Sequence, residues 1–306
     1  MRKLLGIVTA MMLAVTSVSG CFLLDILDEG GEGGEDGGSF TAQAGLLPGK
    51  FTVDDQGHKI GFSQGILLYD YENGGQWRFA DRQWDVSASG AIAHYCWGCS
   101  GYEHGAKVTS PIATSDGHPE DFYAYGDPKA NLGDKTGKAD WGYNAIVNGG
   151  NKEGLWRTPG ASELLYIMSG RKTESGVRYV LAKLDGKRGV VFLPDNWDAS
   201  KYTFNNPNSK QYGTYDQNVI STDDWTKILE PAGCVFLVSA GQTKSWTQDF
   251  PRPVIRAGEE GHYWLNDSHP ADDTETACYF FGPSDASTNC QVRWAGYSVR
   301  LVRDVK

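Results

Sequence analysis

The C-terminal part of the chain alternates short apolar segments with polar ones. Residues 261–264, 277–281 and 291–302 are rich in aromatic and β-branched residues, and Asp, Asn, Ser and Thr fill the segments between them. This pattern predicts sheet strands that bound exposed loops. Because a regular core that carries irregular loops often forms a binding face, these loops are the first candidates for a ligand site.

Residues 1–20 have the features of an export signal. Arg2 and Lys3 precede an apolar run over residues 4–15, which is too short to span a bilayer as a stable helix. The run is followed by Val-Ser-Gly and then Cys21. This order resembles the lipobox of bacterial lipoproteins, in which cleavage before the cysteine leaves it acylated at its thiol and amine. The alternative is an ordinary signal peptide with an incidental cysteine.

We therefore expect Cys21 to be lipidated and residues 21–48 to form a tether on the outer membrane. Residues 25–39 are mainly Gly, Asp and Glu, so glycine entropy and like-charge repulsion leave them nothing to bury. Several acyl chains make a stable anchor, because each buried CH₂ contributes about 0.8 kcal/mol. An acidic run soon after an acylated cysteine resembles the signal that sends lipoproteins of Bacteroidota to the cell surface.

The charge of the chain narrows the class of partner. The formal net charge is −10, and removal of residues 1–20 takes away two positive charges and no acids, which gives −12. Phosphates would be repelled, which argues against nucleic acid as a partner. No run after Cys21 approaches 18 apolar residues, so lipid is the only membrane attachment that the sequence predicts.

Residues 49–306 contain no second linker and no clear repeat, so we expect a single domain. Predicted strands and helices alternate along it. The strands are predicted at residues 51–53, 60–69, 179–184, 190–193 and 235–239, with Asp185-Gly186 as a hairpin turn. One helix is predicted over residues 162–169, with Leu164, Leu165 and Met168 on one face, and a second runs to Leu229 from a cap at Ser221 or Thr222.

Aromatic residues and one long polar segment complete the pattern. Trp77, Trp97 and Tyr102 belong to a run of aromatic residues without helical spacing, which suggests large rings that fill gaps between irregular loops. Residues 103–140 are polar and rich in Gly, Asp and Pro, and we expect them to form a long surface excursion.

The order of several motifs is similar to that of a known family. The motifs occupy residues 77–80, 97–102, 141–146, 148–151, 156–158, 193–197, 220–225, 232–237, 261–264 and 296–302. Together they resemble the paralogous surface lipoproteins of Bacteroidota and Fibrobacter, whose domain is related to C-type-lectin-like and formylglycine-generating-type folds. Cys99, Cys234 and the length of segment 103–140 depart from the family pattern.

The resemblance implies an α+β, C-type-lectin-like domain over residues 49–306, with a twisted, mostly antiparallel sheet, two helices and extensive loops. Some relatives are targets of diversity-generating retroelements, which rewrite codons in the last strands and loops; a fixed binding loop is the simpler alternative. The corresponding residues, which we expect to bind a glycan or protein ligand, are Leu265, Asn266, Asp267, Ser268, His269, Tyr279, Phe281, Gln291, Arg293 and Trp294.

No metal or cofactor is expected. Residues 264–267 look like the Trp-Asn-Asp motif of calcium-dependent lectins with an extra Leu, but calcium needs six to eight oxygens and no partner loop is evident. None of the six histidines forms a short metal-ligand pair on a clear helix or strand, although His94 and His104 could supply a zinc site. A polar turn after a core tryptophan is the simpler reading of residues 265–267.

Five cysteines follow Cys21, and export permits disulfides. Cys278 and Cys290 could staple the final loop if their strands pair suitably, and Cys234 is the natural unpaired thiol. Cys96 and Cys99 have redox-type spacing but no predicted helix behind them to lower a thiol pKa. We expect a non-enzymatic binding protein. The alternatives are a formylglycine-generating-type enzyme, for which the resemblance implies reactive cysteines at Cys278 or Cys290, and a structural component of a surface assembly.

Overall fold

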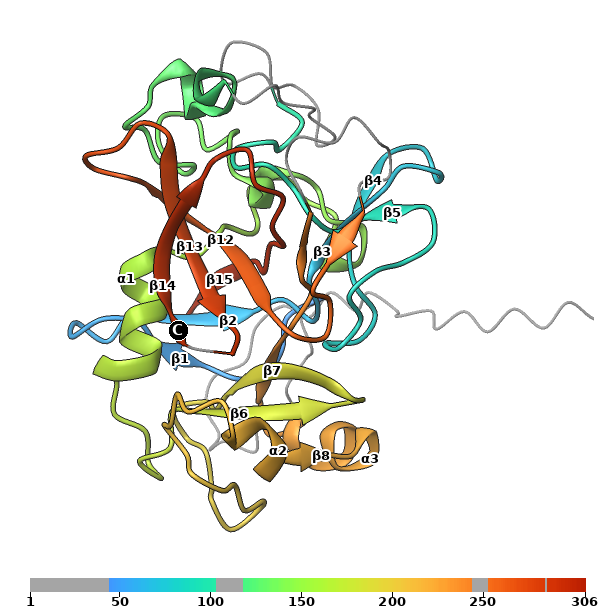
Figure 1. Cartoon of the computed structure of the whole chain (residues 1–306), viewed down its shortest axis with the longest axis vertical. Helices are drawn as coiled ribbons and strands as arrows, with labels where there is room; N and C mark the ends of the chain where they lie inside the picture. Colours follow the sequence, from blue (N-terminus) through green and yellow to red (C-terminus); the bar gives the residue numbers. More distant parts are fainter. Residues whose placement is uncertain (1–43, 103–117, 244–252, 284) are drawn as a thin grey trace, which may run out of the picture. The chain divides into compact units, whose positions relative to one another are not determined.

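The computed structural model describes residues 44–102, 118–243, 253–283 and 285–306. The export signal, Cys21 and most of the predicted tether lie outside these residues. Thr41–Lys306 is one compact unit of mixed α+β type, with mostly antiparallel sheets and few short helices (Figure 1). In the described part, the strands form five small sheets where a single sheet was expected. None of the helices described there is long and apolar enough to cross a membrane.

A four-stranded sheet, here called the inner sheet, has the strand order β8-β6-β7-β9. Its strands are Val219–Ile220 (β8), Tyr179–Leu184 (β6), Lys187–Phe192 (β7) and Val235–Val238 (β9). The predicted hairpin is confirmed: Asp185 and Gly186 both have positive φ, 51° and 73°, as the tight turns that match strand twist require. Only the β6–β8 pair of this sheet is parallel.

Both predicted helices are present, and each ends in a π-helical segment. The first is Ala161–Leu165 (α1) continued by Tyr166–Gly170 (η5), and the second is Thr222–Asp224 (α3) continued by Trp225–Leu229 (η6). Ser221 caps the second, because its side chain accepts the backbone N–H of Asp224. Leu164 and Met168 are buried as expected, but Leu165 is 52% exposed, since one residue turns the side chain about 100° around the axis.

The other helical segments are single turns. They are Pro119–Phe122 (η1), Ala124–Gly126 (η2), Trp141–Tyr143 (η3), Val147–Gly149 (η4) and Thr214–Gln217 (α2). Two of these turns, η1 and η2, lie in segment 103–140, which was expected to be a surface excursion. That expectation is wrong for part of the segment, because Phe122 and Leu132 are fully buried; residues 103–117 lie outside the described part.

A three-stranded sheet, here called the outer sheet, is formed by residues 261–292 near the C-terminus. Its antiparallel strands are Gly261–Ser268 (β12), Glu275–Phe281 (β13) and Ala286–Val292 (β14). The predicted boundaries are wrong here: β12 continues through the expected loop, and the polar segment after Phe281 forms most of β14. β14 is an edge strand, where polar side chains are favoured because they discourage pairing with other chains.

Three smaller sheets complete the described strands. They contain Phe51–Thr52 (β1), Lys59–Phe62 (β2) and Val302–Val305 (β15); Leu67–Asp70 (β3), Gln76–Phe79 (β4) and Ala91–Ile92 (β5); and Gln242–Thr243 (β10) with Val254–Ile255 (β11). The expected strand over residues 60–69 is thus two strands. Residues 296–302 are buried, but β15, which begins at Val302, pairs with β2 and does not extend the outer sheet.

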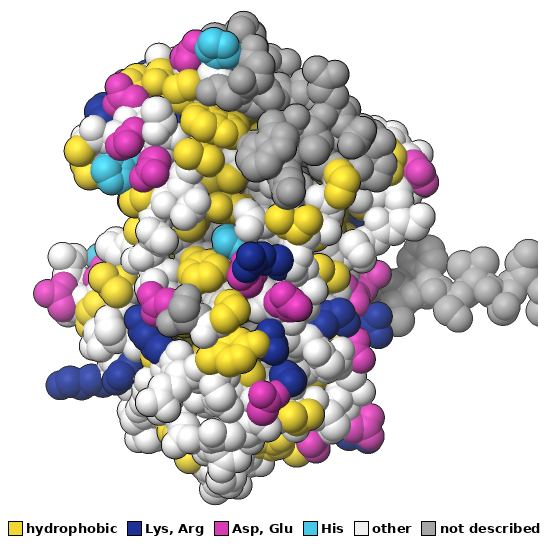
Figure 2. Space-filling model, in the orientation of Figure 1, with side chains coloured by type: hydrophobic (Ala, Val, Ile, Leu, Met, Phe, Trp, Pro, Cys, Tyr) yellow, Lys and Arg dark blue, Asp and Glu magenta, His cyan; other side chains and the backbone are white. Residues whose placement is uncertain are grey.

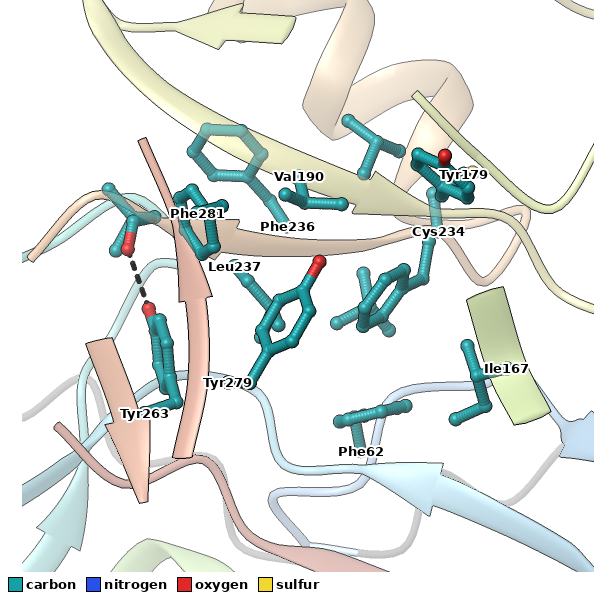
Figure 3. Packing of buried hydrophobic residues seen from close by; sticks show 14 of the residues in the cluster. Phe62, Ile167, Tyr179, Val190, Cys234, Phe236, Leu237, Tyr263, Tyr279 and Phe281 are labelled. Atoms are coloured by element: carbon teal, nitrogen blue, oxygen red, sulfur yellow. Dashed lines mark hydrogen bonds between the residues drawn. The ribbon is translucent and has the colours of Figure 1, made fainter. Parts of the chain in front are cut away.

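Two large apolar clusters form the interior. The first packs the inner sheet against η5, β2 and one face of the outer sheet, and Figure 3 shows Phe236, Leu237, Tyr279 and Phe281 meeting there. The second is rich in tryptophan and lies between irregular segments; it includes Trp77, Trp97, Trp141, Trp156 and Trp264. The expected use of aromatic rings to fill gaps between loops is confirmed.

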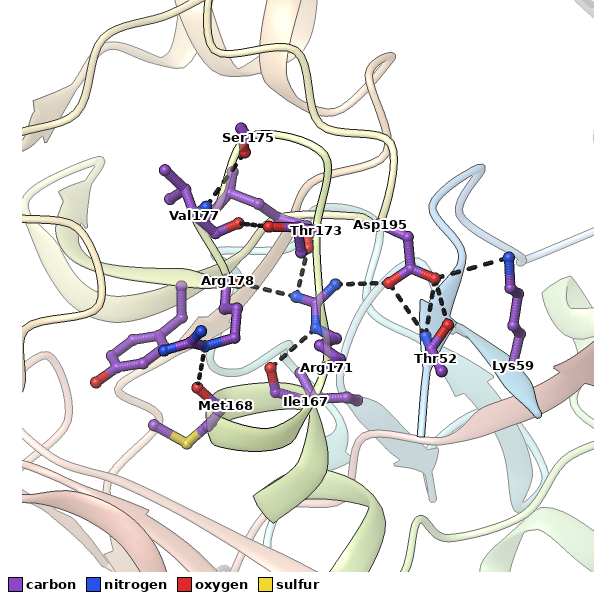
Figure 4. A network of polar contacts seen from close by, with 12 residues as sticks. Thr52, Lys59, Ile167, Met168, Arg171, Thr173, Ser175, Val177, Arg178 and Asp195 are labelled. Atoms are coloured by element: carbon purple, nitrogen blue, oxygen red, sulfur yellow. Dashed lines mark hydrogen bonds and ion pairs between the residues drawn. The ribbon is translucent and has the colours of Figure 1, made fainter. Parts of the chain in front are cut away.

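A buried arginine ties the inner sheet to β1 (Figure 4). The guanidinium of Arg171, with no exposed side-chain surface, donates to Asp195 at 2.9 Å and to the carbonyls of Ile167, Arg178 and Leu193. Asp195 also accepts from the backbone N–H of Thr52 at 3.0 Å. Each charge therefore has its partners inside the protein, as a buried ion pair requires.

Candidate functional site

The residues expected to bind a ligand fall into two groups. Leu265, Tyr279, Phe281 and Arg293 have at most 1% of their surface exposed, so they belong to the scaffold and do not present themselves to a ligand. The expectation fails for Tyr279 and Phe281 because strand β13 lies between two other strands and packs one face on the interior, and Leu265 of β12 packs into the same cluster. The aromatic residues of β13 pack into the interior, although the polar residues on either side of the strand suggested an exposed loop.

Arg293 holds two segments together. Its guanidinium lies 4.5 Å from the ring of Trp97 and 5.3 Å from that of Tyr123. It donates to the carbonyls of Asp273 and Pro128, at 2.9 and 2.7 Å. It thus fixes the β12–β13 loop against the segment around residue 128 by stacking and hydrogen bonding.

The partly exposed residues Asn266, Asp267 and Ser268 also carry structural bonds. The side-chain oxygen of Asn266 accepts the backbone N–H of Gly133 at 2.8 Å, and Asp267 accepts that of Ala161 at 2.6 Å. Burial raises the pKa of Asp267 despite that bond. These oxygens serve neighbouring backbone groups and do not converge, which is not the arrangement of a calcium site.

The remaining three candidates lie at the same end of the outer sheet. Gln291 accepts a hydrogen bond from the hydroxyl of Tyr297 at 3.2 Å, and Trp294 packs against a small buried cluster around Phe122. His269 directly follows β12. Its Nδ1 accepts the backbone N–H groups of Ala271 and Asp272, at 3.2 and 2.7 Å.

Cys278 and Cys290 are not joined: both are free thiols, and so is Cys234, as expected. The expected bond is excluded by strand register. Cys290 is opposite Ala277, whereas Cys278 is opposite Asn289, so the two side chains leave opposite faces of the sheet. Burial raises the pKa of Cys278 strongly, and partial burial followed by the carboxylates of Glu275 and Asp272 raises that of Cys290.

The same register brings together three side chains of types that can ligate metal ions. Glu275 and Cys290 lie on one face of the β13–β14 pair, two residues apart along the ladder, and the backbone N–H of His269 donates to the Glu275 carbonyl. The donor atoms of His269, Glu275 and Cys290 all lie within 4.8 Å of one another, and each residue is partly buried. His94, the alternative ligand, instead lies 3.0 Å from the Ala240 carbonyl, and its proposed partner His104 is outside the described residues.

A groove on another part of the domain has the composition of a ligand site. Its volume is about 640 Å³, and three separate segments contribute to it: the β3–β4 hairpin, residues 100–102 and residues 144–153. Aromatic rings and polar side chains line it together, the main ones being Tyr69, Gln76, Trp77, Tyr102, Asn144, Asn151 and Glu153. The sequence showed the aromatic residues but not their meeting with the amides.

The walls of this groove are held in place before any ligand arrives. The hydroxyl of Tyr102 donates to Glu153 at 2.9 Å, and its ring meets that of Tyr143 edge-on at 5.0 Å. The ammonium of Lys138 lies 5.6 Å from the Tyr102 ring. Asn144 donates to the carbonyl of Ser100 at 3.0 Å. The groove therefore loses little conformational entropy on binding, which favours affinity.

A second groove, about 590 Å³ in volume, lies beside β15. Its charged groups are already paired: Arg157 donates to Glu163 and to Asp304, each at 2.7 Å. Comparison of the chain with known protein families, with curated proteins and with solved structures finds no match.

Proposed function

We propose that this protein is an exported, lipid-anchored surface protein whose folded unit binds a glycan in the aromatic groove defined above. The observation that carries the proposal is the meeting of the partly exposed rings of Tyr69 and Tyr102 with amide and carboxylate side chains in one preformed hollow. Cys21, after a basic and apolar leader, supports the anchor and a location on the outer membrane. The formal charge of −10 supports partners other than nucleic acid.

The chemistry of the groove suits a sugar better than an apolar molecule. A sugar ring has apolar C–H faces, which stack on aromatic rings, and hydroxyl edges, which need hydrogen-bond partners in the ring plane. The exposed side chains of Gln76, Asn151 and Glu153 offer both donors and acceptors at the rim. Convergent polar groups beside aromatic rings can fix the orientation of a small ligand.

The thiols give less support to the enzymatic alternative. A nucleophilic cysteine is activated by a lowered pKa, yet the pKa values of Cys278 and Cys290 are both raised. We therefore favour binding over formylglycine-generating chemistry. The C-type-lectin-like relationship remains part of the proposal; the α+β architecture and the burial of Trp141, Trp264 and Tyr297 from its motifs agree with it.

A glycan array with the full chain purified in detergent tests the proposal. For the glycan bound most strongly, Tyr102→Ala should weaken binding about tenfold, because a stacked ring contributes roughly 0.5–1.5 kcal/mol. Gln76→Ala should weaken it less. Tyr202→Ala is the matched control, because Tyr202 is also partly exposed but packs on Phe204 away from the groove. Absence of any bound glycan, or equal binding by Tyr102→Ala, would overturn the proposal.

The anchor has its own test. Cys21→Ser should move the protein from the outer-membrane fraction to the soluble fraction, since the acyl chains are attached through this thiol. A variant that stays in the membrane would show that attachment has another cause. Strong self-association of the parent without glycan binding would instead favour a structural role in a surface assembly.

A further inference from the structure

The end of the outer sheet carries a cluster that the glycan groove does not use. His269 directly follows β12, Glu275 begins β13, and Cys290 lies near the end of β14. Figure 1 places the β12–β13 loop at the upper left, and Figure 2 shows acidic side chains and a histidine gathered there. The three residues are 21 positions or fewer apart in sequence but come from three different strands or strand ends, so no short motif announces them.

We propose that Cys290, Glu275 and His269 bind a divalent transition-metal ion of the zinc type, with one coordination position left open to an external donor. Their donor atoms already lie within 4.8 Å of one another. Zinc bonds to nitrogen, oxygen and sulfur are roughly 2.0–2.3 Å long, so metal binding would draw the three side chains together around the ion. Three protein ligands leave the fourth tetrahedral position for water or a ligand atom.

The choice of metal follows from the donors. A thiolate and an imidazole favour zinc and related transition metals, whereas calcium and magnesium prefer oxygen ligands alone. Only one of the three donors is a carboxylate. The proposed site therefore differs in its ligand atoms from the calcium sites of calcium-dependent lectins.

The surroundings carry the charge that a cation would neutralise. Within the described residues, no lysine or arginine pairs with Glu275, whereas Asp273 on the same loop pairs with Lys129 at 2.5 Å. Asp272 lies close enough to influence Cys290, and its carboxylate holds Thr274 by two hydrogen bonds, at 2.7 and 2.8 Å. The metal would release the thiol proton to solvent and bind the thiolate.

Binding also has a visible cost. His269 Nδ1 accepts two backbone N–H groups, so Nε2 is the nitrogen open to the metal and carries the ring proton when the imidazole is neutral. A metal on Nε2 needs the lone pair of that nitrogen, so the ring proton moves to Nδ1. Nδ1 then no longer accepts the backbone N–H groups of Ala271 and Asp272, and we expect the amide signals of these two residues to shift when metal binds.

Cobalt(II) titration of the reduced full chain, purified in detergent, provides the test. We expect one equivalent to bind, with a sulfur-to-cobalt charge-transfer band and the visible spectrum of a tetrahedral ion. Zinc should displace it. Cys290→Ser should abolish the band, and His269→Gln and Glu275→Gln should each weaken binding at least tenfold. His118→Gln and Glu174→Gln are matched controls elsewhere on the surface and should bind as the parent does.

Thermal unfolding of each variant without metal separates loss of the site from loss of the fold. A variant that unfolds at the parent temperature and fails to bind supports the site. Two results would overturn the proposal: no charge-transfer band in the parent, or a band of full strength in Cys290→Ser. Either result leaves glycan binding in the aromatic groove untouched, because Tyr102 and Glu153 belong to different segments.

Discussion

The inner and outer sheets are built from similar hairpins, but they differ in whether their charged groups are buried and paired or partly exposed and unpaired. In the inner sheet β9 and most of β6 and β7 are buried, and the adjacent Arg171–Asp195 pair has every partner inside the protein. In the outer sheet β14 is mostly partly exposed, and Glu275 and Cys290 stand beside one another without a cation among the described residues.

This difference separates groups that hold the fold from groups available for binding. A buried charge must be paired, because its desolvation costs several kcal/mol that only close partners offset. A partly exposed charge can remain unpaired at little cost, since water solvates it. Charged and metal-ligating side chains of the outer sheet can therefore remain unpaired and available to a ligand, whereas those buried beside the inner sheet cannot.

The largest expected effect breaks the inner region. Arg171→Met removes one partner of the buried pair and takes a donor away from Asp195 and from three carbonyl groups. We expect the free energy of unfolding to fall by about 3–5 kcal/mol, measured by urea denaturation.

An exposed pair provides the control for that variant. Lys227 and Asp223 lie 2.7 Å apart, and their side chains are 70% and 75% exposed. Lys227→Ala should change stability by no more than about 0.5 kcal/mol. Similar losses for both variants would contradict the distinction drawn here.

A middle-sized effect should appear on acidification. Burial lowers the pKa of His94 to about 4, outweighing its bond to the Ala240 carbonyl, and burial also lowers that of His262. Because the unfolded chain then binds protons more readily, stability is complete above the ordinary value of 6.5 and falls as the pH falls toward 4. The slope should be at most about 1.4 kcal/mol per pH unit for each histidine.

His94→Gln isolates this contribution. Urea denaturation between neutral pH and about pH 5 should show a shallower slope for the variant than for the parent. The comparison removes the effect of carboxylates such as Asp140, whose pKa burial raises and which acts in the opposite direction. His58→Gln should keep the parental slope on the acid side, since His58 is exposed and Asp54 raises its pKa. An unchanged slope in His94→Gln would refute the assignment.

The smallest expected effect concerns Tyr279, which was expected to bind a ligand but is buried. Its buried hydroxyl has no hydrogen-bond partner among the residues that the structure describes. Tyr279→Phe removes this unsatisfied group and should stabilise the protein by up to about 1 kcal/mol. Glycan binding should not change. Weaker glycan binding with unchanged stability would instead return Tyr279 to the ligand site.

Some of the architecture could be predicted from local sequence. The Asp185-Gly186 turn, the Ser221 cap and strand β9 depend on residues within a few positions, where backbone preference and capping decide the outcome. The leader and the expected lipidation of Cys21 are local patterns of the same kind. These features needed no knowledge of distant partners.

The tertiary structure alone decided which polar residues are exposed and which donors meet. A shift of one residue in strand pairing moves a side chain to the opposite face, so the local sequence could not show that Cys290 lies beside Glu275 and away from Cys278. The aromatic groove likewise needs three segments that are distant in the chain. Turns and caps are set by neighbouring residues, whereas both candidate sites are set by long-range packing.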